Sequence, residues 1–276
     1  VFTRYTLRLL TTQQFERATR LICACEDLRT KKHDVRGENL NLGSTKFSIG
    51  LWIGGGAAPN SFKDIGSRDD PIEGAVSIVT KLNNGEEPGG TADVRHIREC
   101  PWCGTAISNG NIDVVNETGK KLTRSSDVKK GEKLRLLIRC KGALPAPLSG
   151  DCLFTRDEGL PVRIIDDEIY ANPPSVIIGT VDKFVRLAWA SQTRSLFGRL
   201  DLKKRLPPPD LIIQDELHLI SGPLGTMVGL FETAVDLIAK DDKQLLPKVV
   251  GSTATIRRAE DQVWGLFMRK VRQFPP

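Results

Sequence analysis

Two adjacent acids and a histidine end a short apolar run in the string DLIIQDELHLISG at 210–222. Asp215 and Glu216 directly follow the strand-like residues 211–214, so we expect them at the carboxyl end of a buried strand. There one carboxylate can hold a magnesium ion through water while its neighbour orients and deprotonates an attacking water. Phosphoryl transfer, and so ATP hydrolysis, needs chiefly such positioning and charge neutralisation. The other interpretation is a helix N-terminus, where the dipole favours acids.

A second string, GSTAT at 251–255, ends the next apolar run along the chain. It places Thr253 and Thr255 at the end of the adjacent candidate strand, where a hydroxyl group can hydrogen-bond a histidine such as His218. A turn followed by a helix cap is the other interpretation of these residues. The pairing of this string with DELH, each after a strand, favours the functional interpretation.

Cysteines at metal-ligand spacing form a second candidate site. Cys100 and Cys103 lie in ECPWCGT, where proline and glycine bend the backbone so that amides face the thiolates and both sulfurs reach one tetrahedral metal. Cys140 and Cys152 follow at wider spacing and would complete a four-cysteine zinc site. Four thiolates leave no open coordination position, so this zinc would shape the fold rather than catalyse.

Other interpretations of the cysteines stay open. The four thiols could be free, or His96 could replace one of them as a ligand. Cys23 and Cys25 fall inside a helical pattern and are predicted to be small core residues. Trp102, beside the first cysteine pair, could stack on a nucleobase or pack against the metal loop.

The elements that must position these residues alternate between strands and helices. A strand over 2–7 leads into a helix in TTQQFERATRLICACEDLR, for which Thr11 and Gln14 predict a capping box. Further strands are expected in KFSIGLWIGGG and at 176–178, 211–214 and 248–252, with helices from about Asp182, over about 226–240 and after TATIRRAED. This order predicts an α/β fold, a parallel sheet with helices on both faces, in which ligands collect at the carboxyl ends of the strands.

Residues 61–171 differ from these flanks because glycine, proline and charge are scattered and periodicity is poor, so we interpret them as an insertion that carries the zinc site.

The chain has 276 residues and a net charge of +6, a mild excess that permits a polyanionic partner. No apolar run approaches the roughly 20 residues of a membrane span, and no signal peptide is evident, so we expect a cytoplasmic protein. Because the chain opens on VFTRYTLRLL without methionine, we expect a segment of a longer protein.

The strings DELH and STAT resemble motifs II and III of superfamily 2 DExH-box (DEAH-box) helicases. RYTLRLLTTQQF, LWIGGG and GTVDKF fall in the order of that fold's nucleic-acid-contacting motifs. The longer strings RYTLRLLTTQQF, GTVDKF and QDELHLISGPLGT are similar to the helicase subunit of the DISARM anti-phage defence system. The resemblance covers about 1–60 and 172–276.

This resemblance implies a RecA-like sheet in two parts, 1–60 and 172–276, interrupted by the zinc-binding insertion 61–171. It implies that Asp215 coordinates Mg²⁺ with ATP, that Glu216 activates water, and that His218 with Thr253 and Thr255 couples the nucleotide site to DNA movement. The implied partners are DNA, ATP and a second DISARM subunit, DrmB. The residues implied to face the DNA backbone are Thr6, Gly54, Gly55, Thr180 and Lys183.

One motif of this helicase class is missing from the sequence. The phosphate-binding string G-x-x-x-x-G-K-[ST] does not occur, and the nearest string, NETGKKL, lacks its first glycine and its hydroxyl residue. We expect this motif and the second helicase lobe outside the given sequence, and we expect the segment alone to be inactive.

A non-catalytic nucleic-acid- or partner-binding module on a RecA-like scaffold is the alternative function, and a metal-dependent nuclease is a third. Short basic strings at 127–139, 203–205 and 257–258 are interpreted as solvated faces or DNA contacts.

Overall fold

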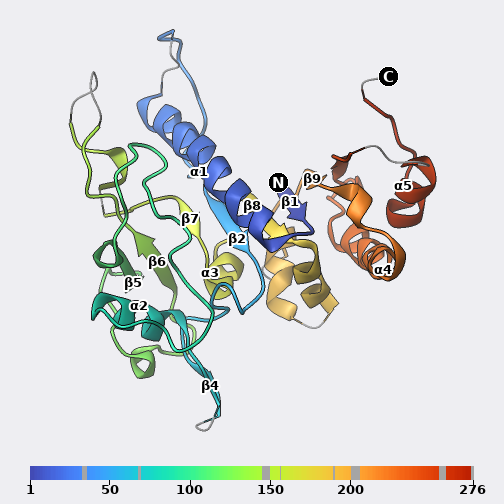
Figure 1. Cartoon of the computed structure of the whole chain (residues 1–276). Coiled ribbons are helices and arrows are strands. Elements are labelled where there is room, and N and C mark those ends of the chain that lie inside the picture. The colour runs from blue at the N-terminus through green and yellow to red at the C-terminus, as the bar shows by residue number, and fades with distance from the viewer. Residues whose placement is uncertain are drawn as a thin grey trace. The chain divides into compact units, whose positions relative to one another are not determined.

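The computed structural model describes residues 1–32, 36–67, 70–144, 150–155, 157–188, 190–199, 206–254 and 259–274. Within these residues the α/β class is confirmed, because a six-stranded parallel sheet is accompanied by helices (Figure 1). Strands rich in isoleucine and valine are typical of such buried parallel sheets. The strands lie in the order β10 (Lys248–Gly251), β9 (Leu211–Gln214), β1 (Phe2–Tyr5), β8 (Val176–Thr180), β2 (Ile49–Trp52) and β7 (Val162–Arg163).

The chain divides into two compact units. One comprises Val1–Thr11 with Ile178–Pro276, and the other comprises Thr12–Ile177. The first unit contains the strands that precede the acid pair and the threonines, and the second contains all six cysteines. The division expected from the sequence, at 1–60, 61–171 and 172–276, stays a prediction.

In the first unit, β9 lies between β1 and β10. Ile212 pairs in parallel with Phe2 of β1 on one side and with Val249 of β10 on the other. Phe2 packs edge-on against Phe184 and Phe197, with ring centroids 5.7 and 5.3 Å apart. These rings form an apolar cluster around β1, which pairs with the strand that leads to Asp215.

A buried ion pair joins β1 to the helix α4 (Gly222–Ile238). Arg4 is 0% exposed, pairs with the carboxylate of Glu232, and places its guanidinium 4.5 Å from the ring centre of Phe184. Two opposite charges removed from water together are tolerated where either alone would be very costly. The pair therefore fixes β1 against α4 within this unit.

The helices of the first unit differ in detail from the sequence prediction. The helix α4 begins at Gly222, about one turn before the predicted start, with Pro223 in its first turn, where a missing amide costs nothing. The helix expected from about Asp182 is instead a 3₁₀ helix, η4 (Val181–Ala188), followed by η5 (Ser191–Phe197). The remaining elements are η6 (Leu217–Leu219) and α5 (Ala259–Phe267).

The long helix α1 (Arg8–Lys31) also begins earlier than predicted. Thr11 donates its amide and its hydroxyl to the carbonyl of Leu7, at 3.0 and 2.8 Å. Both bonds place Thr11 inside the first turn of the helix. The predicted capping box of Thr11 and Gln14 is therefore wrong, because the helix has already started.

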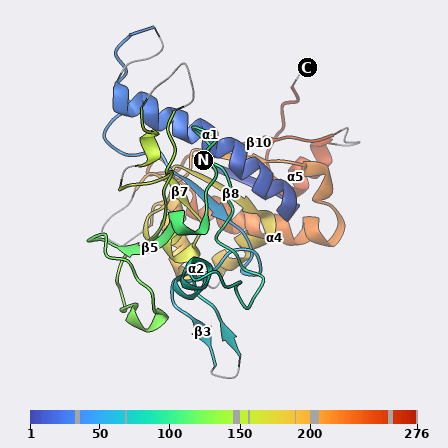
Figure 2. The same cartoon turned by 60° about the vertical axis from the view of Figure 1, so that its left-hand side comes forward.

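The second unit has a core of its own. β5 (Ile112–Asn116) and β6 (Leu134–Ile138) form an antiparallel hairpin, and α2 (Ala75–Asn83) packs against it with buried residues at helical spacing. β7 lies within 61–171 and pairs in parallel with β2, so this region also contributes a strand to the large sheet. Figure 2 shows the short hairpin of β3 (Ile65–Gly66) and β4 (Pro71–Ile72) extending away from α2. The other elements are η1 (Asn109–Asn111), η2 (Ser125–Asp127), η3 (Leu153–Thr155) and α3 (Asp166–Ala171).

No helix in the described part of the chain has the length and apolar character that crossing a membrane requires.

Candidate active site and metal centre

The acid pair lies at the carboxyl end of β9, as expected from the sequence. The amide of Asp215 donates to the carbonyl of Arg4 at 3.0 Å, so the ladder with β1 continues one residue past the strand. The Asp215 carboxylate accepts the amide of Glu216 at 3.0 Å through Oδ1. Both side chains are half-buried. This carboxylate pair suits a hard cation such as Mg²⁺, which prefers oxygen ligands and retains several waters.

Glu216 ends the strand with an unusual backbone conformation. Its φ is 51° and its ψ is 46°, in the left-handed region that residues other than glycine enter at some cost. The chain turns there into η6, which carries His218. Strained backbone of this kind is concentrated at functional sites.

The structure brings DELH and the end of β10 together. Nδ1 of His218 lies 3.3 Å from the Glu216 carboxylate and 3.4 Å from the hydroxyl oxygen of Thr253. The amide of Leu217 donates to the carbonyl of Ser252 at 2.9 Å, so the backbones on both sides are joined as well. A single imidazole nitrogen thus faces both the carboxylate and the hydroxyl, and its proton state governs which of them it bonds. Thr255, the other threonine of this prediction, lies outside the described residues.

Tyr5 borders this site and was missed by the sequence reasoning. Burial, and secondly the negative charge of Asp215, raise the pKa of its hydroxyl. Nothing in the pattern around Tyr5 indicates such a neighbour, because the contact arises only when β1 and β9 pair.

Three of the predicted DNA-contacting residues lie in the first unit. Thr180 ends β8 and Lys183 lies in η4, and each is only 3% exposed. The Oγ1 atoms of Thr6 and Thr180 are buried without a hydrogen-bond partner among the described residues. Burial of these side chains favours packing roles in this conformation, and their contact with DNA stays a prediction.

The other two predicted DNA contacts form a turn after β2. The carbonyl of Gly54 accepts the amide of Ala57 at 2.9 Å, which closes the turn. A Cβ atom on Gly55 would lie 2.5 Å from the side-chain nitrogen of Asn60, so a larger residue would displace that side chain. Close packing therefore already accounts for Gly55, and a phosphate contact at either glycine stays a prediction.

The four cysteines predicted to bind zinc gather in the second unit. The sulfurs of Cys100, Cys103, Cys140 and Cys152 all lie within 4.8 Å of one another. Cys100 and Cys152 are 3.8 Å apart, and Cys103 and Cys140 are 3.4 Å apart. A tetrahedral zinc with bonds of about 2.3 Å places its sulfur ligands about 3.8 Å apart. The cluster therefore fits one zinc ion and is compatible with zinc binding.

Backbone hydrogen bonds shape each half of the cluster, the pair Cys100 and Cys103 and the pair Cys140 and Cys152. In the first half, the amide of Cys100 donates to the carbonyl of Thr105 at 2.7 Å, and Gly104 takes a φ of +77° to close the knuckle. In the second half, the amide of Gly142 donates to the sulfur of Cys140 at 3.2 Å. A Cβ atom on Gly142 would lie 1.9 Å from the hydroxyl of Thr105, so only glycine fits between the halves.

A small hairpin explains the wide spacing between the last two cysteines. The amide of Leu144 donates to the carbonyl of Gly150, and the amide of Cys152 donates to the carbonyl of Gly142, at 2.9 and 3.1 Å. Ala143 pairs with Asp151 in an antiparallel bridge between them. These paired bonds between 142–144 and 150–152 return Cys152 beside Cys140.

The thiols of the cluster differ in acidity. Burial raises the pKa of Cys140 to about 12. Burial also opposes ionisation of Cys103, but its hydrogen bonds with Thr105 and with the neighbouring thiols lower its pKa to about 7. A bound metal replaces thiol protons, so occupancy by zinc would favour the thiolate form of all four.

The remaining predictions for this region are resolved by contacts. His96 does not join the cluster, since its Nε2 bonds the carbonyl of Ala57 at 3.2 Å. Trp102 packs edge-on against Phe154, with centroids 6.4 Å apart, as the packing alternative predicted. Cys23 is fully buried in the core, as predicted, and burial raises its pKa.

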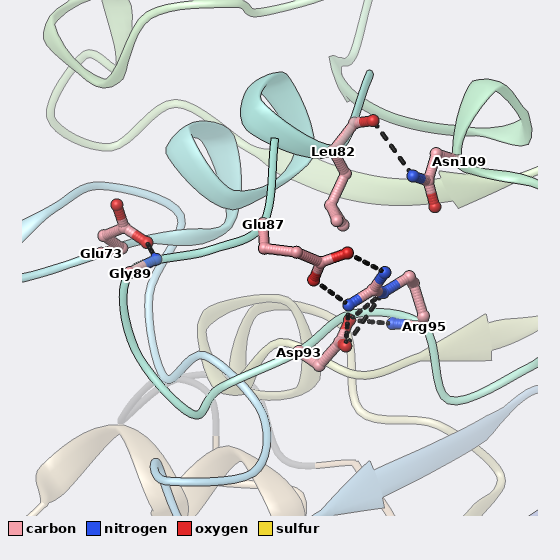
Figure 3. A network of polar contacts seen from close by, with 7 residues as sticks. All are labelled: Glu73, Leu82, Glu87, Gly89, Asp93, Arg95 and Asn109. Atoms are coloured by element: carbon pink, nitrogen blue, oxygen red, sulfur yellow. Dashed lines mark hydrogen bonds and ion pairs between the residues drawn. The ribbon is translucent and has the colours of Figure 1, made fainter. Parts of the chain in front are cut away.

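A polar network holds the segment that leads from α2 to the knuckle (Figure 3). Arg95 bonds both Glu87 and Asp93, at 2.8 and 2.9 Å. The amide of Gly89 donates to Glu73 at 2.9 Å. Although burial alone would raise it, the bonds from Arg95 hold the pKa of Asp93 below its usual value. These bonds hold the chain segment that precedes Cys100 and Cys103.

Comparison with known proteins places the chain. No family model matches it. The chain is 34% identical over 307 residues, covering 100% of its own length, to the DISARM protein DrmA of Bacillus paralicheniformis. It spans 24% of the length of that relative. Over its whole length, therefore, the chain is a DrmA-like segment.

Proposed function

We propose that this chain is part of a cytoplasmic DISARM defence protein that couples ATP hydrolysis to movement along DNA. The observation that carries the proposal is the meeting of the two strings at the ends of neighbouring strands, with Asp215 and Glu216 after β9 and Thr253 after β10. The similarity to DrmA over the whole chain supports the assignment to a DISARM system. DNA and the second subunit DrmB are the proposed partners.

The proposed roles follow from oxygen chemistry at the strand ends. Mg²⁺, when bound with ATP, would neutralise phosphate charge there. Asp215 would hold this ion, and Glu216 would orient and deprotonate the attacking water. His218, Thr253 and Thr255 would link the site to DNA movement, since His218 already lies between Glu216 and Thr253. The phosphate-binding string would come from another part of the full-length protein.

DNA contact and zinc binding are separate parts of the proposal. Thr6, Gly54, Gly55, Thr180 and Lys183 are the proposed contacts with the DNA backbone, and the burial of Thr180 and Lys183 means that DNA would reach them only after a conformational change. The four-cysteine cluster would hold a structural zinc ion. Its donor set leaves no coordination position for catalysis.

A second candidate function is favoured by one observation, the absence of G-x-x-x-x-G-K-[ST] from the sequence. On that hypothesis the segment is a non-catalytic scaffold that binds nucleic acid or a protein partner. The acid pair opposes it, because a scaffold has no need for two adjacent carboxylates beside a histidine.

DNA-stimulated ATP hydrolysis by the full-length protein separates these hypotheses. We expect Glu216→Gln to lower kcat by at least about 100-fold, the loss typical for a missing general base, while DNA binding is kept. Glu260→Gln is the matched control, because Glu260 is exposed on α5. A wild-type protein that binds DNA without hydrolysing ATP would overturn the helicase proposal in favour of the scaffold.

A further inference from the structure

A glutamine on α5 holds the turn that carries His218. Nε2 of Gln262 donates to the carbonyl of Leu217 at 3.0 Å and to the carbonyl of Ile220 at 2.8 Å. Leu217 is the first residue of η6, and Ile220 directly follows its last. One side-chain amide therefore spans the whole turn.

The turn has no other bond of this kind from α5 among the described residues, but it shares an apolar core with that helix. Leu217 and Ile220 are 3% and 1% exposed and cluster with Leu266 and Phe267 of α5. The carbonyl of Leu217 also accepts the amide of Ile220 within the turn, at 3.0 Å. Gln262 adds a second donor there and a donor for the carbonyl of Ile220, which would be unfavourable to leave unpaired out of water. A primary amide supplies two donors and no charge. The hydrogen bonds of Gln262 thus fix the orientation of η6 on α5, which apolar packing alone would not determine.

The position of η6 determines the positions of two proposed active-site side chains, those of Glu216 and His218. Glu216 immediately precedes Leu217 and takes its left-handed backbone conformation there, and His218 lies inside the span held by Gln262. A rotation of η6 would move the Glu216 carboxylate and the His218 ring together. Reaction rates are sensitive to such shifts, since a displacement of about 1 Å can cost about 100-fold.

We propose that Gln262 is a positioning residue for ATP hydrolysis, which fixes η6 and so links α5 to the active site. The inference rests on the proposed function. Gln262 acts through the backbone of the turn and contacts neither Glu216 nor His218 by any bond that the structure shows.

Gln262→Met tests the inference because it keeps the length of the side chain and removes both donors. In the full-length protein we expect kcat for DNA-stimulated ATP hydrolysis to fall by at least about tenfold, with KM for ATP within about twofold of wild type. Amide hydrogen exchange in a peptide covering 216–221 should become faster without nucleotide. Gln273→Met is the matched control, because Gln273 is exposed.

Gln262→Glu supplies a second readout that a loss of stability alone would not give. At pH 8 its carboxylate would face two carbonyl oxygens and repel them, whereas the protonated form at lower pH has one O–H donor. The two facing carbonyl oxygens favour the protonated carboxyl and so raise its pKa above the ordinary value of about 4.3. We expect the deficit in kcat relative to wild type to shrink as the pH falls from 8 to 5.

Three outcomes would overturn the inference: unchanged kcat and exchange in Gln262→Met, a rise in KM with kcat kept, or the same effects in Gln273→Met. Should Gln262→Met fail to fold, the pH profile of Gln262→Glu decides. A wild-type protein without ATP hydrolysis would overturn the proposed function and the catalytic part of the inference, whereas the exchange measurement would still decide whether Gln262 fixes the turn.

Discussion

Glu168 is a carboxyl group that folding removes from water, and the charges of Arg163 and Arg135 only partly offset the effect of its burial. It is 3% exposed, and one oxygen accepts the amide of Leu136 in β6 at 3.0 Å. Burial raises its pKa to about 7. The unfolded chain releases this proton near the ordinary value of 4.5, and the folded chain keeps it up to about 7. Stability is therefore full below 4.5, declines between these values and levels off above pH 7.

We predict that Glu168→Gln stabilises the second unit at pH 8 and has little effect near pH 4.5. A raised pKa of this size corresponds to roughly 3 kcal/mol at high pH, and glutamine can still accept the Leu136 amide. Amide exchange in β6 and thermal unfolding of the full-length protein, each at both pH values, measure the effect. Glu86→Gln is the control, because Glu86 is exposed. Equal destabilisation at both pH values would mean that the folded protein keeps Glu168 ionised.

Residue types and spacing were enough to indicate some of the site and not the rest. Asp215 and Glu216 are visible in the sequence because two acids at the end of an apolar run are unusual. Tyr5, Gln262 and Glu168 are not visible, because each acquires its role from a contact with a distant part of the chain. Nothing local in sequence distinguishes a glutamine that bridges two carbonyls from one in solvent.

The cysteine cluster was also only partly predictable from the sequence, because its two halves depend on different structural elements. The first pair is predicted from its knuckle, whose turn needs only local residues. The second pair depends on the hairpin around Ala143 and Asp151, and its spacing gives no sign of where the chain returns. At Gly142 both halves impose a requirement, because a Cβ atom there would clash with the side chain of Thr105.

We predict that the full-length protein binds about one structural zinc ion per cluster and that Cys152→Ser removes it. Loss of one thiolate should leave the cluster unable to hold the metal tightly, and amide exchange over 98–106 and 138–144 should become faster. Zinc content by mass spectrometry of the metal and exchange by peptide mapping measure this.

Cys25→Ser is the control for the zinc prediction, because Cys25 lies in α1 outside the cluster. It should keep the zinc content of wild type. A Cys152→Ser protein with undiminished zinc would show that the ligand set is different.

Element boundaries were predicted less well than element types. α1 and α4 each begin about one turn early, at Arg8 and Gly222. In α1 the residue predicted to cap the helix, Thr11, lies inside its first turn, and in α4 Pro223 occupies the first-turn position that proline favours. A first turn tolerates both, because its amides have no partners within the helix.

In the molecule as a whole, the order of the strands in the sheet brings the strings DELH and STAT together in one site. The sequence predicts a parallel sheet, and the pairing of β9 with β10 joins the acid pair to Thr253. The position of β1 on the other side of β9 could not be predicted, because no local pattern states which strands are neighbours. The segment spans 24% of its relative DrmA, so we propose that the phosphate-binding residues lie elsewhere in the full-length protein.

The most direct test of the account is the chemical state of bound nucleotide in a single turnover. Full-length protein in excess over radiolabelled ATP, with DNA and Mg²⁺, is quenched at successive times and the ADP is quantified. If Glu216 activates the attacking water, wild type and Glu260→Gln convert bound ATP to ADP, whereas Glu216→Gln binds ATP and retains it unhydrolysed. Formation of ADP by Glu216→Gln at the wild-type rate would contradict the account, because Glu216 could not then be the group that activates water.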